Sequence, residues 1–273
     1  MSGTQVKYIN SSIQIPESAL GINHLFERES HEEASFRCPP QMRRSSSKKT
    51  GQSNSTSASI TFSATDLFRS ASSKASSKEM ERIDNLFYSY ANRSSGMIDP
   101  EGIETLCSDM EVDHTDVRIL MLAWKMRAEK QGYFTLEEWR RGLKSPRADT
   151  VNKLKKVLLD LEKEVKRPSN FVDFYTYAFR YCLTEEKQKS IDIESICQLL
   201  DLVLGPHFRA QVDYFVEYLK IQSDYKVINM DQWMGFYRFC NQISFPDFSN
   251  YDPELAWPLI LDNFVEWMRA KTT

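Results

Sequence analysis

The sequence predicts an all-α protein of two helical subdomains that follow a disordered N-terminal arm. From residue 80 onward, apolar side chains recur at intervals of three and four, which is the spacing of one helix face. Alternating strand patterns are almost absent from the same region. The first 75 residues differ sharply in composition, because residues 43–77 consist mainly of Ser, Thr, Lys and Ala.

The arm, residues 1–75, is expected to be disordered because it cannot bury enough apolar surface to offset the entropy cost of ordering. Two basic pairs, Arg43-Arg44 and Lys48-Lys49, lie inside it. They predict a nuclear import signal, and with it a protein of nucleus and cytoplasm. An equally open interpretation is a solvated linker with serines that can be phosphorylated.

Composition excludes several classes of function. The net charge of −3 and the pI of about 5.9 give no general attraction to nucleic acid or membranes. No segment approaches the roughly 20 apolar residues that span a bilayer. Five scattered cysteines without a Cys-x-x-Cys pair indicate reduced thiols in an intracellular protein.

The first helix is predicted over residues 77–91, where Ser76 and Glu79 have the spacing of a capping box. Apolar residues then follow at helical intervals: Met80, Ile83, Leu86, Phe87 and Tyr90. Further amphipathic helices are expected over residues 100–110, 114–129, 135–144, 150–165, 170–183, 193–204, 207–221, 230–242 and 258–269. The break at Ser145-Pro146-Arg147 divides them into subdomains 76–145 and 146–273.

Three of the later helices carry additional signals. The helix over 170–183 follows a possible Ser169 cap and has the clearest apolar face. Gly205 and Pro206 are a strong stop for the helix before them. Pro258 fits the first turn of the last helix, where its missing N–H costs nothing.

Two loops of the first subdomain have EF-hand spacing without the charges that calcium needs. With Ile98 at loop position 8, Gly96 falls correctly at position 6, but Ala91 occupies position 1. With Phe134 at position 8, Gly132 and Glu138 fall correctly, but Arg127 occupies position 1. The sequence therefore predicts EF-hand-like packing without a metal, and it disfavours a calcium sensor.

No catalytic motif is recognisable. None of the four histidines has metal-ligand spacing, and no phosphate-binding loop or G-x-S-x-G occurs. Cys107, Cys182, Cys197 and Cys240 fall on apolar helix faces and are interpreted as core residues. We therefore predict no catalytic residue and no cofactor. Such a protein can still accelerate a reaction by holding two other proteins together.

Residues 247–267, DFSNYDPELAWPLILDNFVEW, closely resemble the end of the potentiating-neddylation domain of the defective-in-cullin-neddylation protein family. The similarity includes residues 119–134, 170–181 and 228–233, and we place the whole domain at residues 76–268. It implies a non-catalytic co-ligase that binds a cullin and a neddylation conjugating enzyme, and so regulates cullin-RING ubiquitin ligases. The alternative is a cullin-binding regulatory adaptor that does not promote transfer.

The family's cullin-binding patch matches Asp231, Ala256 and Asp262. Two carboxylates beside a small side chain suit the docking of basic residues. Taken singly, each residue has an ordinary alternative. Asp231 could be the N-cap of the helix that follows, Asp262 an exposed acid and Ala256 filler.

The family's second surface is an apolar pocket for the acetylated N-terminal methionine of the conjugating enzyme. Acetylation removes the charge and so lowers the cost of burial, and Gln131 could orient the amide. Thr115, Gly132 and Tyr181 depart from residues that the family can place there, which leaves the enzyme preference open. The matching residues, any of which could instead belong to the core, are Ile103, Cys107, Ile119, Leu120, Leu122, Gln131, Phe134, Tyr181, Leu199 and Leu202.

Overall fold

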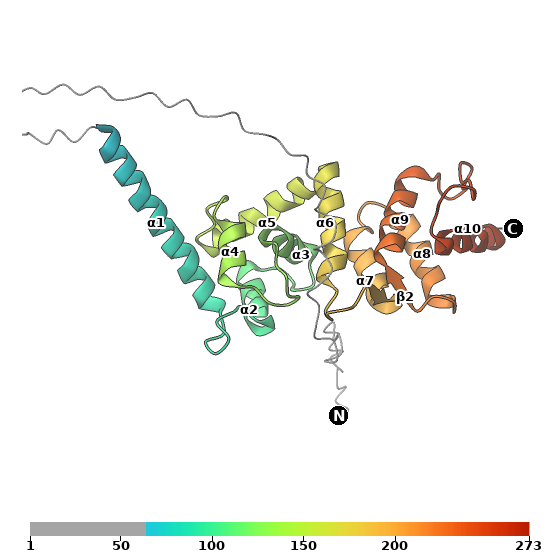
Figure 1. Ribbon diagram of the computed structural model, residues 1–273, viewed down its shortest axis with the longest axis horizontal. Coiled ribbons are helices and arrows are strands. Elements are labelled where there is room, and N and C mark those ends of the chain that lie inside the picture. The colour runs from blue at the N-terminus through green and yellow to red at the C-terminus, as the bar shows by residue number, and fades with distance from the viewer. Residues whose placement is uncertain (1–63, 273) are drawn as a thin grey trace, which may run out of the picture. The chain divides into compact units, whose positions relative to one another are not determined.

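A computed structural model describes residues 64–272 (Figure 1). The basic pairs proposed as an import signal, and the arm up to residue 63, lie outside these residues. Within them the fold is helical, as predicted, with two short strands. The elements are α1 (Ala64–Tyr90), α2 (Pro100–Met110), α3 (Val117–Met126), α4 (Leu136–Leu143), α5 (Val151–Val165), α6 (Pro168–Tyr181), β1 (Ser190–Asp192), α7 (Ile193–Val203), α8 (Arg209–Ile221), β2 (Val227–Asn229), α9 (Met230–Gln242) and α10 (Leu259–Thr272).

Helix α1 begins at Ala64, so the predicted start at residue 77 is wrong. Ser76 lies inside the helix rather than at its cap. The physical reason is that α1 contains neither glycine nor proline, and nothing in its sequence stops a helix from extending toward the N-terminus. The bounds of the disordered arm, residues 1–75, stay a prediction. The boundary between two compact units of the chain falls inside α1, between Lys78 and Glu79. Residues 79–272 belong to one of these units, and the contacts below lie within it.

Two helix–loop–helix hairpins make up the first half of this unit. The loop between α1 and α2 pairs with the loop between α3 and α4 through Ile98 and Phe134. Their backbone N–H groups donate to each other's carbonyl oxygens at 3.0 and 2.9 Å. Gly96 and Gly132 turn the two loops with φ of +69° and +76°. The bridge thus joins the two residues that the spacing placed at position 8, which supports the EF-hand-like prediction.

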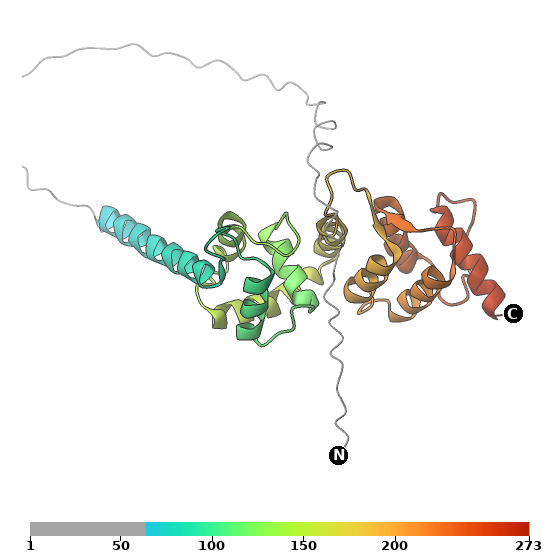
Figure 2. The same ribbon diagram turned by 90° about the horizontal axis from the view of Figure 1, so that it is seen from below.

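The second half repeats this plan, which the sequence pattern did not reveal. Strands β1 and β2 pair antiparallel with Ile191 opposite Ile228, seen in Figure 2 as gold and orange arrows. In both halves the paired residue directly precedes a helix cap. Asp99, Thr135, Asp192 and Asn229 cap α2, α4, α7 and α9. Three-residue strands are too short to produce a detectable alternation.

Helix α6 contacts helices of both halves, α3 on one side and α7 and α9 on the other. Helix α5 packs against α2 and α3, so contacts cross the break after residue 145. The division into subdomains 76–145 and 146–273 stays a prediction.

Aromatic side chains join the last three helices. The ring of Phe215 in α8 stacks on the ring of Phe236 in α9, with 3.9 Å between their centroids. It meets the ring of Phe264 in α10 edge-on, with 5.1 Å between the centroids. In residues 64–272 no helix is long and apolar enough to cross a membrane.

We predict that Glu138→Ala lowers the free energy of unfolding by about 2–4 kcal/mol, because it removes two charge-assisted hydrogen bonds. The buried Glu138 carboxylate accepts the backbone N–H groups of Glu129 at 2.9 Å and Thr135 at 2.7 Å. Urea unfolding measures the effect. Glu137→Ala, at the exposed neighbouring acid, is the matched control and should change stability little. Equal losses in the two variants would contradict this assignment.

Candidate functional sites

A cavity of about 420 Å³ lies between α2, α3, the loop before α4, the end of α6, and α7. Its wall is mainly apolar and comes from both halves of the fold. Of the ten residues predicted for the pocket, the structure brings eight together around this one cavity. They are Ile103, Ile119, Leu120, Gln131, Phe134, Tyr181, Leu199 and Leu202.

Cys107 and Leu122 do not line the cavity. Their exposed fractions are 2% and 0%, so both are core residues. The sequence match could not separate them from the lining, because residues three or four apart share a helix face, and how deeply each is buried depends on the helices packed around it. Burial raises the pKa of the Cys107 thiol to about 11, with nearby Asp113, Asp116 and Glu104 adding to the effect.

The lining also includes residues that the sequence analysis did not predict as lining. Thr115 and Gly132 were noted only as departures from the family. For the other additional lining residues, the sequence offered no indication except that several lie close in the chain to residues predicted for the pocket. These additional lining residues are Pro100, Glu104, His114, Thr115, Asp116, Ala123, Gly132, Cys182 and Thr184.

Two buried polar atoms on the cavity wall have no hydrogen-bond partner, Gln131 Oε1 and Thr184 Oγ1. An unsatisfied buried polar group is costly and rare, so each needs an explanation. The hydroxyl of Tyr181, by contrast, accepts the backbone N–H of Gly132 at 3.2 Å. Burial raises the Tyr181 pKa, which keeps the phenol neutral. The wall is therefore mainly apolar, and the polar atoms Gln131 Oε1 and Thr184 Oγ1 are buried behind its surface.

The described cysteines are poor nucleophiles. Cys107, Cys197 and Cys240 are buried, and Cys182 is partly buried on the cavity wall. Burial raises the pKa of each thiol, to about 12 for Cys182, so the reactive thiolate is scarce at neutral pH.

Asp231 lies exposed in the first turn of α9. The alternative that it caps this helix is wrong, because Asn229 is the cap. The Asn229 side chain accepts the N–H of Gln232 at 2.9 Å, and the Gln232 side chain accepts the N–H of Asn229 at 2.9 Å. The carboxylate of Asp231 has no role in this cap and faces solvent.

Helix α9 packs closely on the segment that leads into α10. A Cβ atom added to Gly235 would lie 2.7 Å from Pro258. Asp231 precedes Gly235 by four residues, and Asp262 follows Pro258 by four. Asp262 is only partly exposed, and its carboxylate accepts a hydrogen bond from Tyr251.

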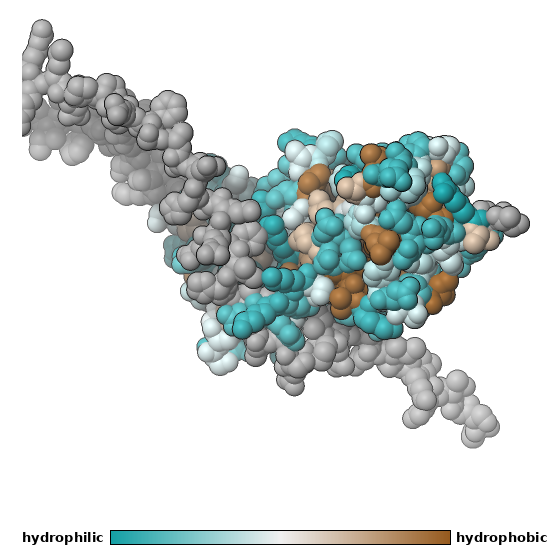
Figure 3. Space-filling model, turned by 45° about the vertical axis from the view of Figure 1, so that its right-hand side comes forward, coloured by the Kyte–Doolittle hydropathy of each residue, from teal (hydrophilic) through white to brown (hydrophobic). Residues whose placement is uncertain are grey.

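Ala256 is exposed in the segment before α10, and its carbonyl oxygen accepts a hydrogen bond from Arg238 at 2.8 Å. The Arg238 guanidinium also lies over the Trp257 ring, 4.1 Å from its centroid. Leu255 and Leu259 beside them are 55% and 66% exposed. The face that Figure 3 brings forward is largely hydrophilic, with hydrophobic residues in separate patches.

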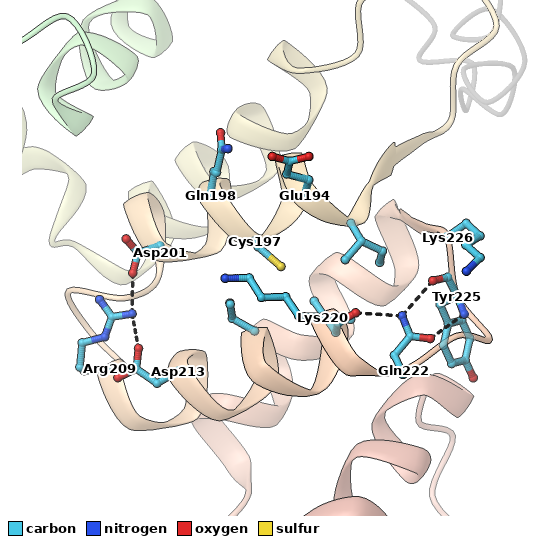
Figure 4. Close-up of a pocket in the computed structure, with 13 residues that line it drawn as sticks. Glu194, Cys197, Gln198, Asp201, Arg209, Asp213, Lys220, Gln222, Tyr225 and Lys226 are labelled. Atoms are coloured by element: carbon cyan, nitrogen blue, oxygen red, sulfur yellow. Dashed lines mark hydrogen bonds and ion pairs between the residues drawn. The ribbon is translucent and has the colours of Figure 1, made fainter. Parts of the chain in front are cut away.

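A larger hollow of about 810 Å³ lies between α7 and α8 (Figure 4). None of the predicted site residues lines it. Its wall carries three acidic and three basic side chains, and Arg209 pairs with Asp201 at 2.5 Å and with Asp213 at 2.6 Å. Such a charged groove fits an uncharged apolar ligand poorly. The smaller cavity is therefore the better candidate for an apolar ligand.

We predict that Gly235→Ala destabilises the protein by about 1 kcal/mol. In an open helix this change adds roughly 1 kcal/mol of stability through better helix propensity. Here the new methyl group would press on Pro258, and overpacking costs about 1–3 kcal/mol. Urea unfolding measures the difference in the free energy of unfolding between the variant and wild type. A variant more stable than wild type would mean that α9 and Pro258 are not in close contact.

Comparison with known proteins places this chain among relatives. A family model described as cullin binding matches residues 153–267. Human DCN1-like protein 4 is 42% identical over 188 residues, which cover 68% of this chain and 62% of that protein. Human DCN1-like protein 5 is 38% identical over 190 residues, covering 68% and 77%, and DCN1-like protein 2 of Dictyostelium discoideum is 38% identical over 177 residues, covering 64% of each chain. The chain therefore belongs to the defective-in-cullin-neddylation, or DCN1-like, family.

Proposed function

We propose that this protein is a non-catalytic scaffold that binds a cullin and a neddylation conjugating enzyme and thereby promotes cullin neddylation. The observation that carries the proposal is the pairing of two separate surfaces on one fold. One is the mainly apolar cavity of about 420 Å³, and the other is the region of α9 and the start of α10, with Asp231 and Ala256 exposed and Asp262 partly exposed.

The cullin is proposed to dock on the face formed by α9 and the start of α10. This face lies within the residues that match the cullin-binding family model. Asp231 and Asp262 are proposed to supply its carboxylates, and the small side chain of Ala256 to permit close approach of a partner. Basic side chains on the cullin are the complementary chemistry, and such charge pairs set specificity and association rate.

The conjugating enzyme is proposed to insert its acetylated N-terminal methionine into the cavity. A methionine side chain is unbranched and adapts to irregular apolar walls such as that formed by Ile103, Leu120 and Leu202. Acetylation turns the terminal ammonium into a neutral amide. The side-chain amide of Gln131, which also lines the cavity, is proposed to orient that amide.

Under this proposal, the chain supplies geometry rather than chemistry. Its described thiols are held protonated by burial, so they are not suited to carry a modifier. Binding both partners at once makes their encounter intramolecular, and this lowers the barrier to transfer.

A second candidate function is a cullin-binding adaptor that does not promote transfer. The observation that favours it is the altered lining of the cavity at Thr115, Gly132 and Tyr181. If these residues exclude the conjugating enzyme, only cullin binding remains. An assay of modifier transfer to a cullin, with and without the purified protein, distinguishes the two functions.

We predict that Asp231→Lys combined with Ala256→Arg weakens cullin binding roughly 100-fold or more, because like charges brought together at a contact cost several kcal/mol. Both residues are exposed, so the fold should remain intact. Asp262 is avoided because its carboxylate bonds to Tyr251. Titration calorimetry measures the affinity, and Glu194→Lys, at an exposed acid of α7, is the control. Unchanged affinity in the double variant would remove the patch assignment.

We also predict that an acetylated peptide with the N-terminal sequence of a neddylation conjugating enzyme binds at least roughly 100-fold more tightly than the same peptide with a free amine. Burying an unpaired ammonium costs on the order of several kcal/mol. Leu202→Trp, which enlarges a partly exposed wall residue, should block the acetylated peptide and leave cullin binding unchanged. Fluorescence polarisation measures both peptides, and equal affinities would favour the adaptor function.

A further inference from the structure

An exposed arginine of α9 holds the segment before α10 that carries Ala256. This segment is not helical, so no helical hydrogen-bond pattern fixes the backbone of Ala256. The Arg238 guanidinium donates to the Ala256 carbonyl oxygen at 2.8 Å, and it lies over the Trp257 ring, 4.1 Å from its centroid. One side chain of α9 thus contacts two successive residues of the segment.

The contacts continue from Trp257 to Asp262. The Trp257 ring stacks on the ring of Tyr251, with 5.9 Å between the centroids, and meets Phe239 of α9 edge-on at 5.8 Å. The Tyr251 hydroxyl donates a hydrogen bond to the carboxylate of Asp262. Burial raises the pKa of Tyr251, and the bond to Asp262 adds to this effect, so the phenol stays protonated and remains a donor.

Arg238 also shares a helix with the third residue of the proposed cullin face. Asp231 precedes it by seven residues, which is about two turns of an α-helix, so both exposed side chains lie on one side of α9. The contacts of Arg238 therefore connect the helix of Asp231 with the segment of Ala256. Through two aromatic rings they extend to Asp262.

We propose that Arg238 is a positioning residue of the cullin-binding face, which holds Ala256 and Trp257 against α9 before the cullin docks. This inference rests on the proposed function and deepens it. A guanidinium suits the role, because it is planar and can lie on an aromatic ring while it donates hydrogen bonds. A segment that is fixed in advance lowers the entropy cost of binding.

The charge of Arg238, taken alone, predicts the opposite effect. A cation on a face that attracts basic residues opposes their approach, so its removal should strengthen cullin binding. Positioning predicts weaker binding instead, because a segment that is no longer held must be ordered when the cullin docks. The sign of the change in affinity therefore separates the two roles.

The test measures the affinity of the full chain for a cullin by titration calorimetry. Arg238→Ala should weaken binding about tenfold, because it removes both the hydrogen bond and the ring contact. Arg238→Lys keeps a donor but not the planar group, and should weaken binding about threefold. Lys189→Ala removes one positive charge at an exposed position elsewhere and should leave the affinity nearly unchanged.

A double-mutant cycle with Trp257→Leu shows whether Arg238 acts through the segment. If it does, the two losses overlap, and Arg238→Ala should weaken binding by less than about twofold in the Trp257→Leu background. Losses that add in full would show that Arg238 contacts the cullin directly, and would overturn the inference. Urea unfolding of each variant checks that it is folded under the conditions of the titration.

The outcomes also separate this inference from the proposed function. If the wild-type protein does not bind a cullin, the proposed function fails and the inference fails with it. If wild type binds and Arg238→Ala binds equally well or more tightly, the cullin-binding face stands and the positioning role of Arg238 is overturned.

Discussion

The arrangement of both candidate surfaces depends on the double anchoring of helix α6. Toward the C-terminal half, Tyr175 stacks on Trp233 at 4.2 Å, and each side chain donates a hydrogen bond to the other's backbone carbonyl, at 3.1 and 3.0 Å. Toward the N-terminal half, Asp173 accepts from Trp124 at 2.8 Å and from Arg127 at 2.7 Å. Burial opposes ionisation of Asp173, but these bonds outweigh it and hold its pKa below the ordinary value. A single rigid helix thus connects α9 with the loop that begins at Arg127.

Under the proposed function, the two anchored ends of α6 link the cavity to the proposed cullin face. The cavity takes Tyr181 from the end of α6, and the proposed cullin face includes Asp231 from α9, the helix that Tyr175 and Trp233 hold. The Tyr175–Trp233 pair therefore links one helix of each surface. A protein that works by proximity needs this property, because small errors in the position of the reactants reduce the rate strongly.

The sequence predicted the features that depend on the spacing of residues along one helix. It did not predict those that depend on contacts between helices far apart in the chain. The existence of α2 to α10 follows from apolar periodicity, and eight lining residues follow from similarity to a family. The start of α1 was missed because a Ser- and Ala-rich stretch carries no apolar face to recognise. Asn229 rather than Asp231 caps α9, a choice of two positions that only the backbone geometry decides. Cys107 lies one helical turn from Ile103, and only the surrounding helices decide that it is buried below the cavity wall rather than part of it.

Glu138 stands at the loop position from which an EF-hand glutamate binds its ion, yet both its carboxylate oxygens accept N–H groups of its own loop. Arg127, at the first position of that loop, is engaged by Asp173. The loop that supplies Gln131 and Phe134 to the cavity thus closes by internal hydrogen bonds. Under the proposed function, this loop holds its shape without a bound ion, and regulation would come through the partner. The cavity would take only those N-termini that an acetyltransferase had already modified.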